Sequence, residues 1–214
     1  MKLYYIPGAC SLSSHIVLSE CGLPYDLEKV DCTTMKTERG IDYRTINPKG
    51  YVPAIELDNG EVLTEAAVIA QYVADLVPEK GLSPPYGSVE RYRLMEWLNF
   101  IATEIHKGFS PLFHPKITDE MKTLVIERLN TRIDYVAKQL EGKNYLLGNH
   151  FSVADAYLFT ILSWAKNLKV DLSRWSVLSG YMRRIGDRPA VFKALAEEGL
   201  IEGSKKVERG TVAA

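Results

Sequence analysis

In the first part of the chain, one short stretch is rich in strand-forming residues and three more alternate hydrophobic and polar residues, as expected of β-strands. The stretches are residues 2–6, 26–31, 52–58 and 61–65. Asn59-Gly60, between the last two, is a strong signal for a hairpin turn. Apolar residues follow helical spacing over residues 11–21, which Gly22 closes, and over residues 64–78. The predicted order is β-α-β followed by β-β-α, with the first two strands parallel and the hairpin adding antiparallel strands.

A segment rich in proline and glycine separates this part from the rest of the chain. Within residues 78–88, three prolines and two glycines exclude a helix or a central strand. Beyond it, apolar residues recur at helical spacing over residues 89–109, 119–142 and 151–168, and over two shorter stretches within about 176–198. The pattern predicts an α/β domain over residues 1–80, a linker over 81–87, an all-helical domain over 88–201 and a flexible polar tail over 202–214.

One helix start is predicted in detail. Ser152 and Asp155 have the spacing of a capping box, and Phe151 stands where a hydrophobic staple would pack. The helix that follows is apolar on nearly every face, which predicts a position at the centre of the helical domain. We therefore interpret Asp155 as a helix cap and not as a catalytic acid.

Composition narrows the classes of function. The chain has 214 residues, of which 46% are hydrophobic and 25% charged, so it is long enough to bury a sizeable core. Its formal net charge of −1 leaves no basic excess for nucleic acid. Neither a signal-peptide apolar run nor a membrane-spanning stretch is found. We expect a cytoplasmic protein without nucleic-acid or membrane partners.

Three cysteines are expected to be free thiols, because their odd number and spacing fit neither a disulfide framework nor a zinc site. Cys10 directly precedes the helix of residues 11–21, where unpaired amides and the helix dipole favour a thiolate. A buried, inert cysteine is the alternative. The run from Cys10 to Ser13 has the spacing of a redox C-x-x-C motif with a hydroxyl replacing the second sulfur. Cys21 is expected to be inert, and Cys32 has no informative context.

Two further stretches contain candidate ligand-binding groups. A cis Val52-Pro53 bond would leave the Val52 backbone free to pair with an extended, peptide-like ligand, although an ordinary trans bond is the default. Glu65 and the amides around Ala66 stand at a helix start, which suits an anionic group. A carboxylate that only stabilises the helix dipole is an equally good interpretation of Glu65.

The helical part adds a polar stripe. Asn99, Thr103 and His106 fall at positions i, i+4 and i+7 of an otherwise apolar helix. Such a stripe faces water more often than a ligand, and His106 is equally consistent with a hydrogen-bonded structural histidine.

Together, four stretches resemble the cytosolic glutathione S-transferases, specifically the bacterial beta class with a cysteine at the active site: "YYIPGACSLSSHIVLSE", "NPKGYVPAIELDNGEVLTE", "LNFIATEIHKGFSPLF" and "FSVADAYLF". The resemblance covers roughly residues 1–200 in unbroken order. It implies a thioredoxin-like N-terminal domain that binds glutathione, and an all-helical C-terminal domain that shapes the site for a hydrophobic co-substrate. It also implies a homodimer, with no metal and no permanently bound cofactor.

The resemblance also implies roles for individual residues. Cys10 is similar to the class's active-site cysteine, which forms a mixed disulfide with glutathione, and His106 to its partner from the helical domain. Ser11, at the same helix start as Cys10, is a plausible hydroxyl donor to the glutathione sulfur. Val52, ahead of a cis Pro53, is expected to pair with the cysteinyl part of glutathione.

The remaining expected contacts hold the other parts of glutathione. Glu65 and Ala66 are expected to bind the γ-glutamyl end, Ala66 through its amide alone because it lacks the hydroxyl that many relatives have. The helical domain contributes Asn99, Thr103, Glu104 and Ile105, either within one chain or across the dimer. Met35 stands where the family often has a basic residue, so a charge contact there depends on Lys36.

We therefore expect a transferase that conjugates reduced glutathione to hydrophobic electrophiles, with a thiol-disulfide or peroxidase side activity through Cys10. One alternative is that the main activity is redox chemistry, as in a glutathione-dependent thiol-disulfide oxidoreductase or a reductive dehalogenase. Another alternative is a non-catalytic protein that binds hydrophobic ligands. Four residues either line the co-substrate pocket or belong to the core: Phe109, Phe113, His114 and Trp164.

Overall fold

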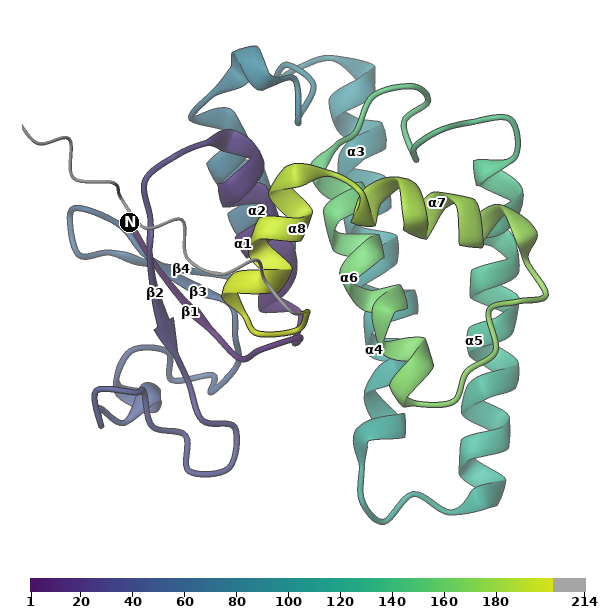
Figure 1. Cartoon of the computed structure of the whole chain (residues 1–214), viewed down its shortest axis with the longest axis horizontal. Coiled ribbons are helices and arrows are strands. Elements are labelled where there is room, and N and C mark those ends of the chain that lie inside the picture. Colours follow the sequence, from purple (N-terminus) through teal and green to yellow (C-terminus); the bar gives the residue numbers. More distant parts are fainter. Residues whose placement is uncertain (202–214) are drawn as a thin grey trace, which may run out of the picture.

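The N-terminal part is built on a four-stranded mixed sheet. The computed structural model describes residues 1–201 (Figure 1), so the predicted tail at 202–214 lies outside the described residues. Strand β1 (Lys2–Tyr5) pairs in parallel with β2 (Asp26–Lys29) and antiparallel with β3 (Ala54–Glu56), which pairs antiparallel with β4 (Val62–Thr64). The strand order is β2-β1-β3-β4, and the predicted parallel pair and antiparallel hairpin are confirmed.

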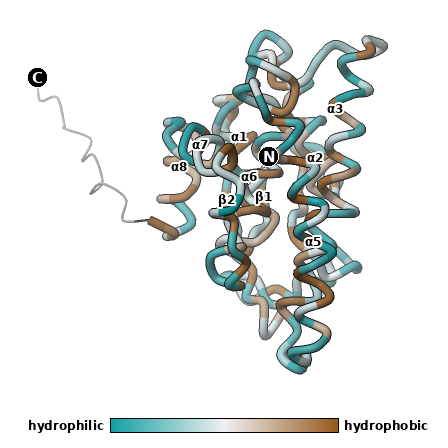
Figure 2. Tube along the Cα trace, turned by 90° about the vertical axis from the view of Figure 1, so that its right-hand side faces the viewer, coloured by the Kyte–Doolittle hydropathy of each residue, from teal (hydrophilic) through white to brown (hydrophobic). Residues whose placement is uncertain are grey.

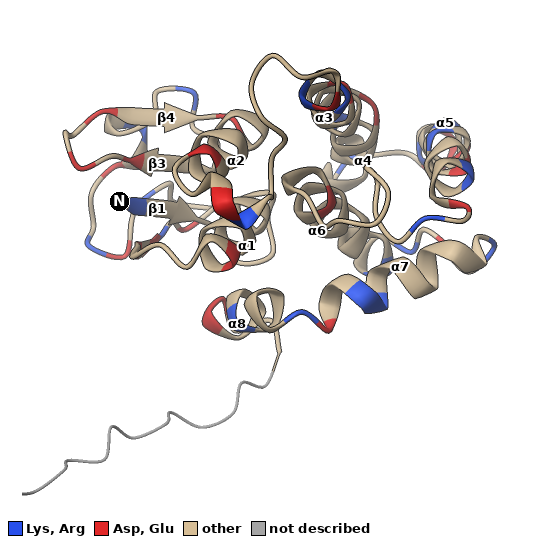
Figure 3. Cartoon of the chain, turned by 90° about the horizontal axis from the view of Figure 1, so that it is seen from above, with Lys and Arg blue, Asp and Glu red and all other residues tan. Residues whose placement is uncertain are grey.

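Two helices cover one face of this sheet. Helix α1 (Ser11–Cys21) follows β1, and Gly22 ends it in the left-handed conformation, with φ of 69°, as the sequence predicts. Helix α2 (Ala66–Asp75) follows the hairpin. Figure 3 shows α1 and α2 between the sheet and the helical part, so both helices are buried from two sides. Two short 3₁₀ helices, η1 (Tyr43–Thr45) and η2 (Pro78–Lys80), lie in the connections.

The helical part begins with a run that is not one regular helix. Helix α3 (Val89–Phe100) continues into a π-helix, η3 (Ile101–His106), and then into the short α4 (Lys107–Phe109) and the 3₁₀ helix η4 (Ser110–Phe113). The prediction of one regular helix over residues 89–109 is therefore wrong in its middle. Each residue of a π-helix turns through a smaller angle than in an α-helix, so residues on either side no longer share the expected face.

Four further helices follow within residues 1–201: α5 (Asp119–Leu140), α6 (Val153–Asn167), α7 (Ser176–Gly186) and α8 (Pro189–Glu197). Hydrophobic and hydrophilic bands alternate along α5 in Figure 2, as expected of a helix with one face in the core. Figure 3 shows both signs of charge on the helices of the two parts. No helix within residues 1–201 is long and apolar enough to cross a membrane.

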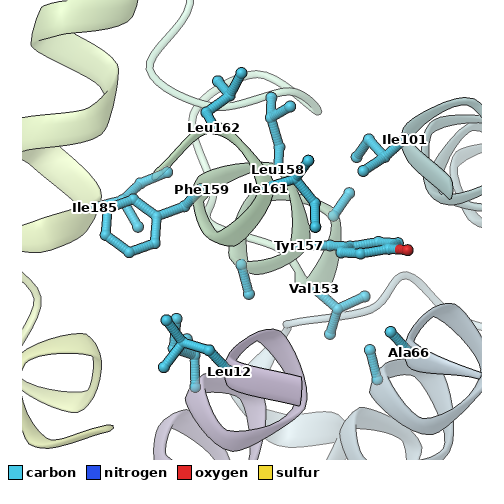
Figure 4. Close-up of a cluster of buried hydrophobic side chains, with 14 of the residues drawn as sticks. Leu12, Ala66, Ile101, Val153, Tyr157, Leu158, Phe159, Ile161, Leu162 and Ile185 are labelled. Carbon is cyan, nitrogen blue, oxygen red and sulfur yellow. The ribbon is translucent and has the colours of Figure 1, made fainter. Parts of the chain in front are cut away.

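Helix α6 lies at the centre of the molecule, as its apolar sequence predicts. In Figure 4 its side chains meet Leu12 of α1, Ala66 of α2 and Ile185 of α7, and one hydrophobic core runs through both parts of the chain. The predicted capping box is confirmed at its start, where the Asp155 carboxylate accepts from the Ser152 backbone N–H at 2.9 Å. The same carboxylate accepts from the Leu146 N–H and the Tyr181 hydroxyl, both at 2.9 Å, which makes it a buried structural anchor.

Helix α8 returns to the N-terminal part and packs on α1 (Figure 1). Arg188 donates to both carboxylate oxygens of Glu20 at 2.6 and 2.9 Å. Just past α8, the buried Glu198 bonds His15 Nδ1 at 3.0 Å and accepts from the Gly8 N–H at 2.8 Å. The C-terminal segment thus holds the loop that leads into Cys10.

Candidate active site

A pocket of about 290 Å³ lies where the start of α1, the loop before β3, the start of α2 and the π-helix meet. Its lining residues come from both parts of the chain: Cys10, Asn47, Lys49, Tyr51, Val52, Pro53, Thr64, Glu65, Ala66, Ala102, His106, Lys107, Ser110 and Tyr157. Three larger grooves lie elsewhere: one between α3 and α5, one along the segment from Asp75 to Glu90, and one between Met1 and Tyr72. None of the three is lined by a cysteine, so the pocket around Cys10 is the candidate active site.

Cys10 places its sulfur in this pocket as a thiol. Its Sγ donates to the Val52 carbonyl at 3.1 Å, a bond that requires the proton. Burial raises the pKa of the Cys10 thiol to about 11, and it outweighs the amides of Cys10 and Ser11 and the charge of Lys107, which all lower it. The expectation of a thiolate is therefore wrong for Cys10 itself. The two amides still point to the place where a sulfur anion would be stabilised.

Ser11 does not offer its hydroxyl to the pocket. The side chain is fully buried, and its Oγ both accepts from the Ile6 N–H and donates to the Ile6 carbonyl at 3.2 Å. Ser11 therefore contributes its backbone amide. Cys21 is buried among apolar side chains, which raises its pKa to about 12 and fits the inert thiol that we expected. Cys32 is exposed.

The loop before β3 presents backbone groups to the pocket. The Val52-Pro53 peptide bond is cis, as the resemblance implies and against the default expected from the residues alone. The Tyr51 carbonyl accepts from the Asn47 side chain at 2.6 Å and from the Tyr43 hydroxyl at 2.8 Å. These two bonds fix the loop, so the Val52 backbone is held in place beside the Cys10 sulfur.

Glu65 stands at the start of α2 in an unusual backbone conformation. Its φ is 73°, a region that side chains other than glycine rarely adopt and that clusters at functional sites. The carboxylate accepts from Lys49 Nζ at 2.7 Å, and Lys49 also donates to Thr64 at 3.0 Å. Ala66 follows at the first turn of α2. Both residues line the pocket.

Because of the π-helix, the three residues of the predicted polar stripe do not share one face of the helix, and His106 faces the pocket. It lines the pocket with Ala102, whereas Asn99 and Thr103 are exposed. Its Nδ1 lies 2.7 Å from the Tyr157 hydroxyl, and its ring meets Trp164 edge to face at 5.1 Å between centroids. Burial, followed by the nearby Lys107 charge, lowers the pKa of His106 to about 4, so the imidazole is neutral near pH 7.

Six of the expected binding residues do not line the pocket within the chain: Met35, Lys36, Asn99, Thr103, Glu104 and Ile105. Met35 packs on a second apolar cluster, and Lys36 is exposed on the loop that follows β2. Glu104 lies 2.7 Å from Arg132 of α5, and Ile105 is fully buried. Within residues 1–201, the structure therefore does not bring these six side chains to the lining of the pocket.

Sequence reasoning missed two cations of the pocket. Lys49 lies four residues before Pro53, and Lys107 directly follows His106. Lys107 also places its Nζ 5.6 Å from the centre of the Tyr51 ring. Their position close to candidate site residues in the sequence could have indicated both lysines. A single lysine, however, is usually interpreted as a solvated surface charge.

Aromatic side chains of the helical part lie next to the Cys10 loop. Trp164 donates its indole N–H to the Gly8 carbonyl at 2.8 Å and meets Phe113 edge to face at 5.1 Å. Phe113 is 54% exposed, and His114 is exposed as well. Phe109 is fully buried and belongs to the core. Of the four residues considered for a co-substrate pocket, Trp164 and Phe113 are therefore the best placed.

Comparison with known proteins identifies relatives over the whole fold. A family model described as "Glutathione S-transferase, N-terminal domain" matches residues 8–76, and one described as "Glutathione S-transferase, C-terminal domain" matches residues 100–189. Glutathione S-transferase GstA of Escherichia coli O157:H7 is 48% identical over 94% of this chain and 100% of its own length. Glutathione S-transferase GST-4.5 of Xanthomonas campestris is 38% identical, again over 94% of this chain and 100% of its own length.

Solved structures agree with these relatives. The ternary complex of BphK, described as a bacterial GST, superposes with a TM-score of 0.92 at 55% identity and covers 93% of this chain and 100% of its own. A sphingomonad glutathione S-transferase complexed with glutathione gives a TM-score of 0.91 at 45% identity, over 94% of this chain and 100% of its own.

Proposed function

The chain belongs to the glutathione S-transferase family, and we propose that it conjugates glutathione to hydrophobic electrophiles in the pocket around Cys10. It is a glutathione transferase of the bacterial beta type, with glutathione as its co-substrate and a thioredoxin-like domain followed by a helical domain. We assign residues 1–80 to glutathione binding, 81–87 to the linker and 88–201 to the helical domain.

One observation supports this site above all: a single pocket joins a helix start, a fixed loop backbone and a carboxylate paired with a lysine. The amides of Cys10 and Ser11 can donate to an anionic sulfur. The Val52 backbone can pair with an extended peptide. The Glu65 carboxylate can accept a hydrogen bond from an α-amino group. The positive charges of Lys49 and Lys107 can neutralise those of carboxylates in the ligand. Glutathione, an extended tripeptide with one thiol, one amino group and two carboxylates, matches these groups.

The chemistry requires a sulfur anion at the helix start. The glutathione thiol loses its proton to water, and the thiolate attacks the electrophilic carbon; a carbon–sulfur bond forms, and the bond to a leaving group such as chloride breaks. The amides of Cys10 and Ser11 stabilise the thiolate. His106 is neutral and weakly basic, so its role is to donate a hydrogen bond and not to accept the proton.

A redox activity is a second candidate, and the position of the Cys10 sulfur in the pocket favours it. In this reaction the Cys10 thiol loses its proton to water, and its thiolate attacks the glutathione sulfur of a mixed disulfide between glutathione and another thiol; the Cys10–glutathione disulfide forms, and the other thiol leaves as a thiolate. The thiolate of a second glutathione then attacks the Cys10–glutathione disulfide, which forms glutathione disulfide and releases Cys10. The motif lacks a second sulfur, because Ser13 stands where a resolving cysteine would be.

The test compares conjugation of 1-chloro-2,4-dinitrobenzene with reduction of a small mixed disulfide by the wild type, Cys10→Ala and the control Cys32→Ala. We expect the wild type and the control to perform both reactions. Loss of only the disulfide reduction in Cys10→Ala would assign Cys10 to redox chemistry, and loss of both would place it in conjugation as well. A wild type without glutathione-dependent conjugation of any aryl halide or epoxide would overturn the proposal.

The helical domain is proposed to supply the electrophile site and the dimer contact. Phe113 and Trp164 provide an aromatic surface beside the Cys10 loop. Tyr92 and Met95 of α3 are exposed apolar side chains on the helix that also exposes Asn99. Pairing of this surface in a homodimer would bring Asn99, and with it Thr103 and Glu104, to the partner's glutathione. A light-scattering mass of a single chain at micromolar concentration would contradict the dimer.

A further inference from the structure

Tyr157 reaches the active site from the core helix α6 and has a polar end in apolar surroundings. Its side chain is 3% exposed. Figure 4 shows it pointing from α6 into the space between Ile101 of the π-helix and Ala66 at the start of α2, with Val153 nearby. A phenol buried in such a place is found with a hydrogen-bond partner. Within residues 1–201, its hydroxyl has one partner, Nδ1 of His106 at 2.7 Å.

The direction of this hydrogen bond follows from counting protons. A phenol has one proton to donate, and a neutral imidazole has one N–H and one bare nitrogen. If His106 Nδ1 carried the proton and donated it, the Tyr157 proton would lack an acceptor among the described residues. If Tyr157 donates to a bare Nδ1, both groups are satisfied, and the single proton of the imidazole lies on Nε2.

The ionisation of the two groups is consistent with this direction. Burial lowers the pKa of His106 to about 4, so the ring is neutral at pH 7 and must choose one tautomer. Burial also raises the pKa of Tyr157 far above its usual range, with the nearby Cys10 and Glu65 adding to the shift, so the phenol keeps its proton. The ring plane is fixed as well, because Trp164 meets the imidazole edge to face at an interplanar angle of 70°.

We propose that Tyr157 is a positioning residue that fixes His106 as the Nε2–H tautomer, so that His106 presents a neutral N–H donor to the ligand in the Cys10 pocket. Tyr157 itself need not touch the reacting atoms. A donor held in this way strengthens as charge collects on a sulfur or an oxygen in the pocket, and it needs no reorientation during the reaction. The proposal concerns the site described under the proposed function, although the tautomer exists without any ligand.

The test measures the tautomer directly by long-range ¹H–¹⁵N correlation NMR of the histidine ring nitrogens in the full chain, with His106 assigned by His106→Gln. We expect a bare Nδ1 and a protonated Nε2 at pH 7 in the wild type. In Tyr157→Phe we expect mixed tautomers and a protonation midpoint above the value of about 4 expected for the wild type. Conjugation by this variant should slow about three- to tenfold, as for the loss of one hydrogen bond.

Two variants separate positioning from general structural damage. Tyr181→Phe removes another buried phenol, one that bonds Asp155 on the far side of α6, and it should leave the His106 signals unchanged. In His106→Gln the side-chain amide always offers a donor, so adding Tyr157→Phe to it should cost no further activity. A wild-type His106 that is protonated on Nδ1 would overturn the proposal, as would an unchanged tautomer in Tyr157→Phe. Neither result depends on the chain showing transferase activity.

Discussion

Cys10 should be a poor nucleophile in the free protein, although it stands at a helix start. Burial raises its pKa to about 11, well above that of an exposed cysteine. The thiolate fraction at pH 7 is then about one in ten thousand, which is roughly a hundredfold below that of an unperturbed cysteine. Because only the thiolate reacts with iodoacetamide, we expect alkylation of Cys10 to be slower by about the same factor.

The assay measures the alkylation rate between pH 6 and pH 11 in a Cys32→Ser background, with mass spectrometry to locate the adduct. The rate should rise tenfold per pH unit through most of this range and approach a plateau only near pH 11. The exposed Cys32, measured in a Cys10→Ser background, provides the reference rate in the same buffers. An inflection of the Cys10 rate below pH 8 would refute the reasoning, because it would mean that the helix amides outweigh burial.

Three further outcomes test other parts of the structure. Lys49→Met should raise the KM for glutathione about two- to fivefold, because Lys49 lines the pocket. Lys36→Met should leave the KM unchanged, because Lys36 lies outside the pocket. Equal effects of the two substitutions would refute this placement of the two lysines. Because the pKa of His106 is lowered in the folded protein, the unfolded chain binds a proton at a higher pH than the folded chain does. The free energy of unfolding should therefore fall by up to about 3 kcal/mol as the pH drops from 6.5 to 4. Urea denaturation of the wild type and of His106→Gln measures this fall, which should be smaller in the variant. Asp155→Ala should lower the free energy of unfolding by at least about 2 kcal/mol, because the Ser152 N–H and the buried Tyr181 hydroxyl lose their acceptor. Asp171→Ala, on an exposed turn, is the control and should change the free energy of unfolding little.

The features predicted correctly from the sequence are those determined by neighbours along the chain. The Asn59-Gly60 hairpin, the Gly22 helix end and the Ser152–Asp155 capping box each rest on a few consecutive residues. In each case a local hydrogen bond or backbone preference decides the structure, and the rest of the fold agrees with it. Element ends were less accurate, as in β3, where the predicted 52–58 shortens to Ala54–Glu56.

The features that sequence reasoning predicted wrongly depend on residues far apart in the chain. The π-helix between Phe100 and Lys107 has no local signal in "IATEIH", and its position decides that His106 faces the pocket while Thr103 faces outward. Ser11 has the right place at the helix start, but its hydroxyl bonds Ile6 at the end of β1. Neither outcome can be read from spacing, because each is set by how one element packs on another.

The ionisation of the site shows most clearly why local reasoning was insufficient. At Cys10 the sequence contains the amides that lower a thiol pKa, but it does not contain the burial that raises it, and burial is the larger effect. In the proposed mechanism a ligand thiolate would bind directly before those amides, whereas the Cys10 proton is held by the Val52 carbonyl. The same helix start can therefore keep the protein's own thiol protonated and still stabilise the sulfur anion of a bound ligand. This difference is why we assign conjugation to the ligand sulfur and redox chemistry to Cys10.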